Sequence, residues 1–241
     1  MALPINSSGL LQIDNDGGGN VTFNAGFTFT AGSDAVLTIA HYATGQSISG
    51  VTIGGASATL IASADKVSGS ENSARIYLAQ NVTGGTANVV ISYSGGTDHY
   101  ISCGVDEWAS GVLDSSALDT GTPNSAAAFT TTPSVSTAIS TSQANTIVYV
   151  VHVTNTTSTS NGITGPTGWN VVWTEQDSTN HEGGRGAWIE ESTTGTKTAT
   201  MSQSVVGWGL AIAALKLAGS SGTVVNPLTG RGGAAARPLA A

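Results

Sequence analysis

The 241 residues combine 32 glycines with few charged side chains, and the formal net charge at pH 7 is −8. With only seven lysines and arginines, the chain would repel nucleic-acid phosphates and anionic lipids, which excludes both as expected partners. Small, β-branched and turn-forming residues dominate, a composition typical of many short strands and not of long helices.

Targeting and redox signals are few. Cys103 is the only cysteine, so no intramolecular disulfide can form, and we expect it to fill a core position. The first residues have no basic region followed by an apolar run, which argues against a signal peptide. The longest apolar run, 210–217, is interrupted by Lys216 and is far shorter than the ~20 residues of a membrane-spanning helix. We therefore expect assembly inside a cell and no membrane partner.

Strands in the first half are predicted from short apolar or alternating stretches between turn residues, at 10–13, 21–30, 36–42, 51–53, 58–62, 74–93 and 100–105. The stretch 74–93 is interpreted as a β-hairpin, because Gly84 and Gly85 supply the positive φ of a tight turn. Residues 109–134, rich in Ser, Thr, Ala, Gly and Pro, are interpreted as a connection between two halves.

The second half repeats the pattern of the first, including a second predicted hairpin at 185–203. The matches are 36–42 with 147–153 and Tyr77 with Trp188, both at an offset of 111, and Val89 with Met201 at an offset of 112. A nearly constant offset through several strands indicates an internal duplication. The final strand, 208–217, is apolar on both faces and so requires cover on both sides.

The predicted fold is an all-β, jelly-roll-like antiparallel β-sandwich built from two pseudo-repeated units, with an extended C-terminal tail. The predicted divisions are a first unit at 1–108, the connection at 109–134, a second unit packed on the first at 135–218, and an extended arm at 219–241. The arm lacks periodicity, which is typical of a segment that gains order on binding. Its candidate partner-binding residues are Val224, Val225, Pro227, Leu228, Arg231, Arg237, Pro238 and Leu239.

Two candidate metal or acid–base sites each have a structural alternative. Residues 14–20 (DNDGGGN) begin like a calcium loop, but Gly18 and Ala25 stand where oxygen ligands are required, and a tight turn explains the same residues. His41 and His152 are equivalent in the repeat and could form a functional pair. The favoured interpretation is a strand-end histidine that closes the core with its polar edge outward. No cofactor or metal is expected.

Catalytic patterns are missing from the sequence. No nucleophile elbow is present, and the carboxylate pairs Asp106-Glu107 and Glu190-Glu191 are adjacent residues, which point to opposite faces of a strand. We therefore expect no catalytic residues and no enzyme activity, with a hydrolase of unrecognised type as a remaining alternative. Trp169, Val171 and Trp173 are predicted to share a strand face, where the two indoles could stack on a sugar or, as favoured, fill the core.

Several strings carry a family resemblance: GVTIGGASATL at 50–60, RIYLAQNVTGGTANVVISYS at 75–94, and GRGAWIEESTTGTKTATMSQSVVGWGLAIAALKLA at 184–218. With these strings the chain resembles a β-sandwich, jelly-roll family found in tailed-phage structural gene cassettes and bacterial genomes. The chain departs from that family at Asn81-Val82, where a proline-containing turn is expected, and in its tail.

The resemblance implies a non-enzymatic virion structural protein, most specifically a capsid decoration (cement) protein. It would be assembled in the host cytoplasm, reside in the virion, and bind the major capsid protein or other virion subunits. A homo-oligomer is expected. The alternatives are a tail or fibre component, or a glycan-binding adhesion module that uses Trp169 and Trp173.

Overall fold

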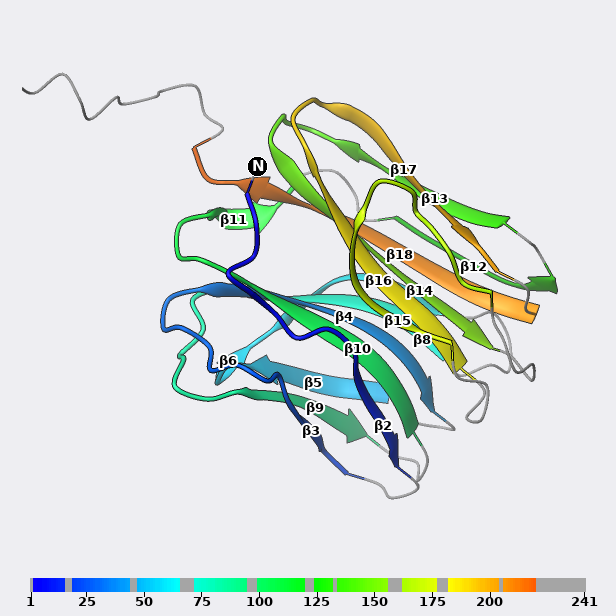
Figure 1. Cartoon of the computed structure of the whole chain (residues 1–241), viewed down its shortest axis with the longest axis horizontal. Coiled ribbons are helices and arrows are strands. Elements are labelled where there is room, and N and C mark those ends of the chain that lie inside the picture. The colour runs from blue at the N-terminus through cyan, green and yellow to red at the C-terminus, as the bar shows by residue number, and fades with distance from the viewer. Residues whose placement is uncertain are drawn as a thin grey trace, which may run out of the picture.

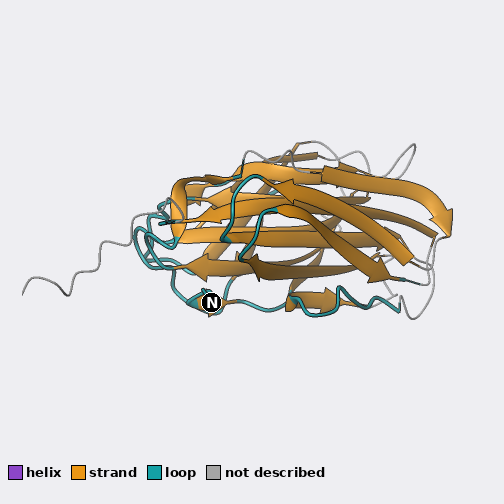
Figure 2. Cartoon of the chain, turned by 90° about the horizontal axis from the view of Figure 1, so that it is seen from above, coloured by secondary structure: helices purple, strands orange, loops and turns teal. Residues whose placement is uncertain are grey.

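The computed structural model describes residues 2–15, 19–43, 47–65, 72–94, 99–119, 124–131, 134–155, 162–176, 182–203 and 206–219. Every regular element within these ranges is a strand (Figure 2). Every pairing between these strands is antiparallel. The predicted all-β antiparallel sandwich is therefore confirmed. The candidate arm residues 224–239 lie outside the described residues.

The first unit has two sheets. Its inner sheet runs β1–β10–β4–β8–β7, with β2 also pairing with β10. Its outer sheet runs β3–β9–β5–β6. The strands are β1 (Asn6–Ser7), β2 (Leu11–Asn15), β3 (Val21–Asn24), β4 (Asp34–Ala43), β5 (Ser47–Ile53), β6 (Ala56–Ser57), β7 (Thr59–Asp65), β8 (Asn72–Ala79), β9 (Asn88–Ser94) and β10 (His99–Trp108).

The second unit has the same plan. Its inner sheet runs β11–β18–β14–β16–β15, with β12 also pairing with β18, and its outer sheet pairs β13 with β17. The strands are β11 (Leu113–Leu118), β12 (Asn124–Thr131), β13 (Ser134–Thr141), β14 (Thr146–Asn155), β15 (Asn170–Glu175), β16 (Glu182–Glu191), β17 (Gly195–Ser202) and β18 (Val206–Leu217). Strand for strand, the sheets of the two units correspond, and β5 with β6 is the addition in the first unit. The predicted pair of pseudo-repeated units is thereby confirmed.

The four sheets stack in the order outer, inner, inner, outer (Figure 1). Separate hydrophobic clusters fill the interior of each unit, and a third cluster lies between the two inner sheets. We call this third cluster the seam. β18 contributes Ala211, Ala213 and Leu215 to the seam and Leu210, Ile212 and Ala214 to the interior of the second unit. The cover predicted for both faces of this strand is confirmed.

The two predicted hairpins are wrong. β8 belongs to the inner sheet and β9 to the outer sheet, and β16 and β17 are divided in the same way. Asn81, Gly84 and Gly85 have φ values of 54°, 76° and 74°, so the glycine-bearing turn carries the chain from one layer to the other. Glycine permits a positive φ in either kind of connection, so the turn residues alone do not distinguish them.

The alignment of the repeat is correct in β4 and β14 but differs by one residue in β8 and β16. Leu37 pairs with Tyr77, and its equivalent Val148 pairs with Ile189, so Ile189 is the structural counterpart of Tyr77. Trp188 instead faces the seam. One residue of offset reverses the face of a strand, which explains the error.

The interpretation of 109–134 as a connection also requires correction. This range contains β11 and β12, and both pair with β18 in the inner sheet of the second unit. The two strands occupy the places that β1 and β2 occupy beside β10. Their small side chains made them look like a linker, whereas they are edge strands of the second unit.

Candidate functional site

The tryptophan platform, the less favoured alternative for Trp169 and Trp173, does not form. β15 contains a bulge, with Val171 opposite Ala187 and Trp173 opposite Gly186, so Val171 and Trp173 no longer share a face. Trp173 is 2% exposed within the seam, and its Nε1 donates to Thr38 Oγ1 at 2.8 Å. Trp169 packs against the interior cluster of the second unit instead. The core alternative accounts for Trp173.

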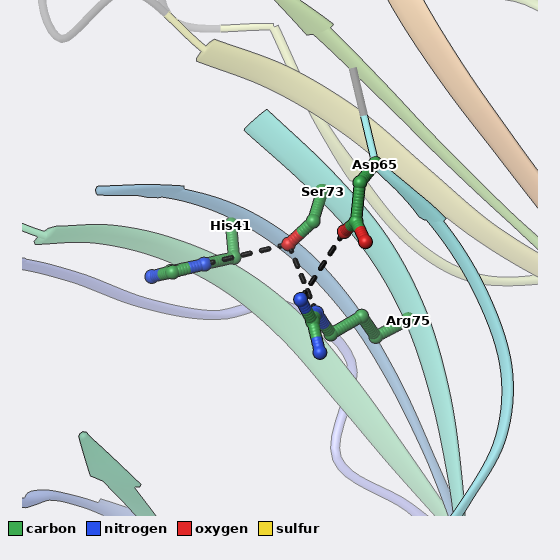
Figure 3. Close-up of polar contacts among 4 residues, drawn as sticks. All are labelled: His41, Asp65, Ser73 and Arg75. Carbon is green, nitrogen blue, oxygen red and sulfur yellow. Dashed lines mark hydrogen bonds and ion pairs between the residues drawn. The ribbon is translucent and has the colours of Figure 1, made fainter. Parts of the chain in front are cut away.

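His41 belongs to a polar chain within the first unit (Figure 3). Its Nδ1 lies 3.4 Å from Ser73 Oγ, to which Arg75 Nε also donates at 3.1 Å. Arg75 Nη2 then forms an ion pair with Asp65 Oδ1 at 3.1 Å. The order of groups differs from that of a nucleophile relay, because the carboxylate contacts the arginine and does not orient the histidine. His41 and Ser73 are 2% and 4% exposed, so the pair is buried.

His152 is buried as well, at 0% exposure. Its Nε2 lies 2.8 Å from Gln203 Oε1, and burial lowers the pKa of the imidazole to about 4. The ring is therefore neutral near pH 7. The expectation that both repeat-equivalent histidines turn a polar edge outward is wrong, because the outer sheets cover the faces on which they lie.

The seam contains a polar network that the sequence analysis missed. Tyr149 OH donates to Asp106 Oδ2 at 2.8 Å and accepts from Trp108 Nε1 at 3.0 Å. Burial raises the pKa of Asp106 to about 6, although side-chain hydrogen bonds from Ser7 and Tyr149 oppose that rise. Burial also raises the pKa of Tyr149. The sequence does show a carboxylate, Asp106, within an apolar strand. It does not show that Tyr149 of the other unit would be its partner.

Glu107, the neighbour of Asp106, points to the opposite side of β10, as predicted for adjacent strand residues. Burial alone would raise its pKa, but hydrogen bonds from Ser33, Asn6 and Thr30 lower the pKa below its usual value. These donors are Ser33 Oγ at 2.7 Å, Asn6 Nδ2 at 2.6 Å and Thr30 N at 2.6 Å. The carboxylate thus ties the N-terminal segment and the 30–33 turn to β10.

An open groove lies where the two units meet at one end. A cavity of about 390 Å³ is lined by β6–β8 on one side and β11 on the other, with Ile61, Leu78 and Ala117 as its apolar part. The polar side chains of the lining are Ser57, Thr59, Gln80 and Ser116. Leu118, which is partly exposed, completes it. Beside the groove, the pairing of β11 with β18 is irregular between Leu113 and Leu118.

A second cavity of about 410 Å³ adjoins the first, and Gln80 lines both. Gln80 Nε2 donates to the backbone oxygen of Asp114 at 2.9 Å, which joins the units at this point. The second cavity is more polar and includes Asp34 and Asp114 in its wall. Ala218, close to the end of the described residues, also lines it. We call the two cavities together the junction groove.

The remaining candidate sites are only partly described. Asp16, Gly17 and Gly18 of the calcium-like sequence lie outside the described residues, as do all eight candidate residues of the arm. Within the described ranges, no cluster of three or more His, Cys, Asp or Glu side chains is placed to hold a metal ion. The same part of the chain has no helix that is long and apolar enough to cross a membrane. Cys103 is buried, as expected.

No family model and no curated protein matches the chain. Among solved structures, the protein YhaK from Escherichia coli aligns over 89% of this chain and 88% of its own, with 9% sequence identity and a TM-score of 0.23. A similarity this low carries no argument about fold or function.

Proposed function

We propose that this chain is a non-enzymatic structural protein of a phage virion, most specifically a capsid decoration protein that docks on other virion subunits. The observation that best supports this proposal is the location of its reactive side chains. His41, Ser73, His152 and Asp106 are each at most 4% exposed, and each is held by neighbours inside a sheet stack. Groups so placed stabilise a body; they do not meet a substrate.

The end of the described chain supports the same proposal. β18 ends at Leu217, and Ala218 N donates to the oxygen of Val112 at 2.8 Å at the edge of the body. Residues 220–241, which lack apolar periodicity in the sequence, follow directly after this point. A segment without its own core adds contact area only by lying on another surface, which is the behaviour expected of a docking arm.

Co-sedimentation with stripped capsids of the parent phage tests the proposal. Full-length protein should pellet with the capsids, and a chain ending at Ala218 should bind less. A full-length variant with Arg231→Glu and Arg237→Glu is the matched control, because it changes the charge of the arm and leaves its length unchanged. Binding to tail preparations in place of capsids would identify a tail or fibre component. Failure to bind any virion part would reject the proposal.

A glycan-binding module is the alternative function from another class, and the position of Trp173 counts against it. The proposed platform required Trp169 and Trp173 on one exposed face, whereas Trp173 lies within the seam. A glycan array would test this alternative directly.

A further inference from the structure

The junction groove has the character of a peptide-binding surface. Its apolar part, Ile61, Leu78 and Ala117, is bordered by hydroxyl and amide side chains, and Leu118 at its edge is 38% exposed. An apolar floor with a few polar groups at the rim suits an extended segment that has scattered apolar side chains.

The chain itself supplies such a segment at the correct place. Ala218 lines the more polar cavity, so the arm begins inside the groove and not at a distance from it. Residues 220–241 span at most roughly 70–80 Å when extended, which is ample to follow a groove that begins beside them. They include four large aliphatic side chains, Val224, Val225, Leu228 and Leu239.

Charge distribution favours the same occupant. All fifteen acidic residues and five of the seven basic ones precede residue 220, which leaves a formal charge of −10 on residues 1–219 and +2 on the arm. Asp34 and Asp114 lie in the wall of the groove, and the arm carries Arg231 and Arg237 with no acidic residue. Opposite charges draw the segment toward this surface.

We propose that residues 220–241 dock in the junction groove of their own chain. The aliphatic side chains lie on the apolar floor, and the arginines face the acidic wall. Tethering favours the chain's own arm over that of a second copy, because a short flexible link gives an effective concentration on the order of mM. Docking on another virion subunit then has to displace the arm from its groove.

Disulfide trapping in the full chain tests this docking. Ser116→Cys places a thiol on the exposed wall of the groove, Leu228→Cys places one in the arm, and the native Cys103 is buried. Mild oxidation should close a bond within the monomer, detected by mass and gel filtration. Adding Leu118→Lys, which puts a charge at the apolar edge of the groove, should slow closure at least several-fold. The matched control is Leu60→Lys, because Leu60 is similarly exposed (41%) but does not line the groove.

A second thiol pair, Thr22→Cys with Leu228→Cys, measures how fast a bond closes through random encounters of the arm with the surface. Thr22 suits this purpose because it is exposed on the outer sheet of the first unit. Closure of the Ser116 pair no faster than this pair would overturn the proposal, as would closure insensitive to Leu118→Lys. Covalent dimers as the main product would assign the groove to the arm of a second copy and also overturn it. Capsid binding is measured separately, so failure here and failure of the proposed function are distinguishable.

Discussion

Replacing Asp106 with asparagine should make the protein relatively more stable at alkaline pH. The folded-state pKa of Asp106 is raised from 3.8 to about 6, so the folded state holds this proton more tightly than the unfolded state does. The contribution of the group to the free energy of unfolding is therefore greatest below pH 4 and is lost as pH rises through 6. A difference of roughly two pKa units corresponds to about 3 kcal/mol. Asparagine does not ionise and retains an oxygen that can accept from Tyr149.

Urea unfolding followed by tryptophan fluorescence at pH 4 to 8 would measure the effect. The free energy of unfolding of Asp106→Asn minus that of the wild type should rise by about 2–3 kcal/mol between pH 4 and pH 8, because pH 4 lies just above the unfolded-state pKa. Titration of His152 occurs in both proteins and cancels in this difference. Asp65→Asn is the matched control, because the Asp65 side chain is 64% exposed, and its difference should stay within about 1 kcal/mol. A flat difference for Asp106→Asn would refute the assignment of a buried, proton-retaining carboxylate.

Two further predictions concern buried positions. The pKa of His152 is lowered from 6.5 to about 4, so the contribution of this residue to the free energy of unfolding is present above pH 6.5 and is lost as pH falls toward 4. In urea titrations, the wild type should therefore lose about 3 kcal/mol relative to His152→Gln between pH 7 and pH 4. A constant difference would contradict this. Gly186→Ala should cost at least about 1–3 kcal/mol in thermal or urea unfolding, because a Cβ there would collide with the Trp173 ring and Thr38. Gly50→Ala, which meets nothing closer than 4.0 Å, is the control, and an equal loss in both variants would reject the packing argument.

The sequence predicted the parts of the fold that depend on local pattern. Alternation of apolar residues marks strands such as β4 and β14, and repetition of that pattern indicates the duplication. The pairing of strands was not predictable in the same way. The connection after β8 has the same kind of residues whether it turns within one sheet or passes to another layer. The single offset in β16 shows the same limit, since a shift of one residue leaves composition unchanged and reverses the face.

The candidate sites depend on contacts between distant segments, which explains why most were missed. Asp106 and Tyr149 are 43 residues apart, and neither residue predicts the other. The junction groove lies between β7 and β11, which are distant in the sequence, and the irregular pairing of β11 beside it leaves no mark in the residue types. The histidines were found because the repeat places them in equivalent positions, but their burial depends on the outer sheets.

The two units act as one body because each buries an indole donor against the other. Trp108 of the first unit donates to Tyr149, and Trp173 of the second donates to Thr38. Thr38 and Tyr149 are equivalent positions of β4 and β14 at the offset of 111, so the duplicated strands present their hydroxyl acceptors to each other's unit. Separating the units would exchange these hydrogen bonds for bonds to water, at about 0.5–1.5 kcal/mol each, and would expose the apolar side chains of the seam, among them Trp108, Trp173 and Trp188. Motion between the two units is therefore costly.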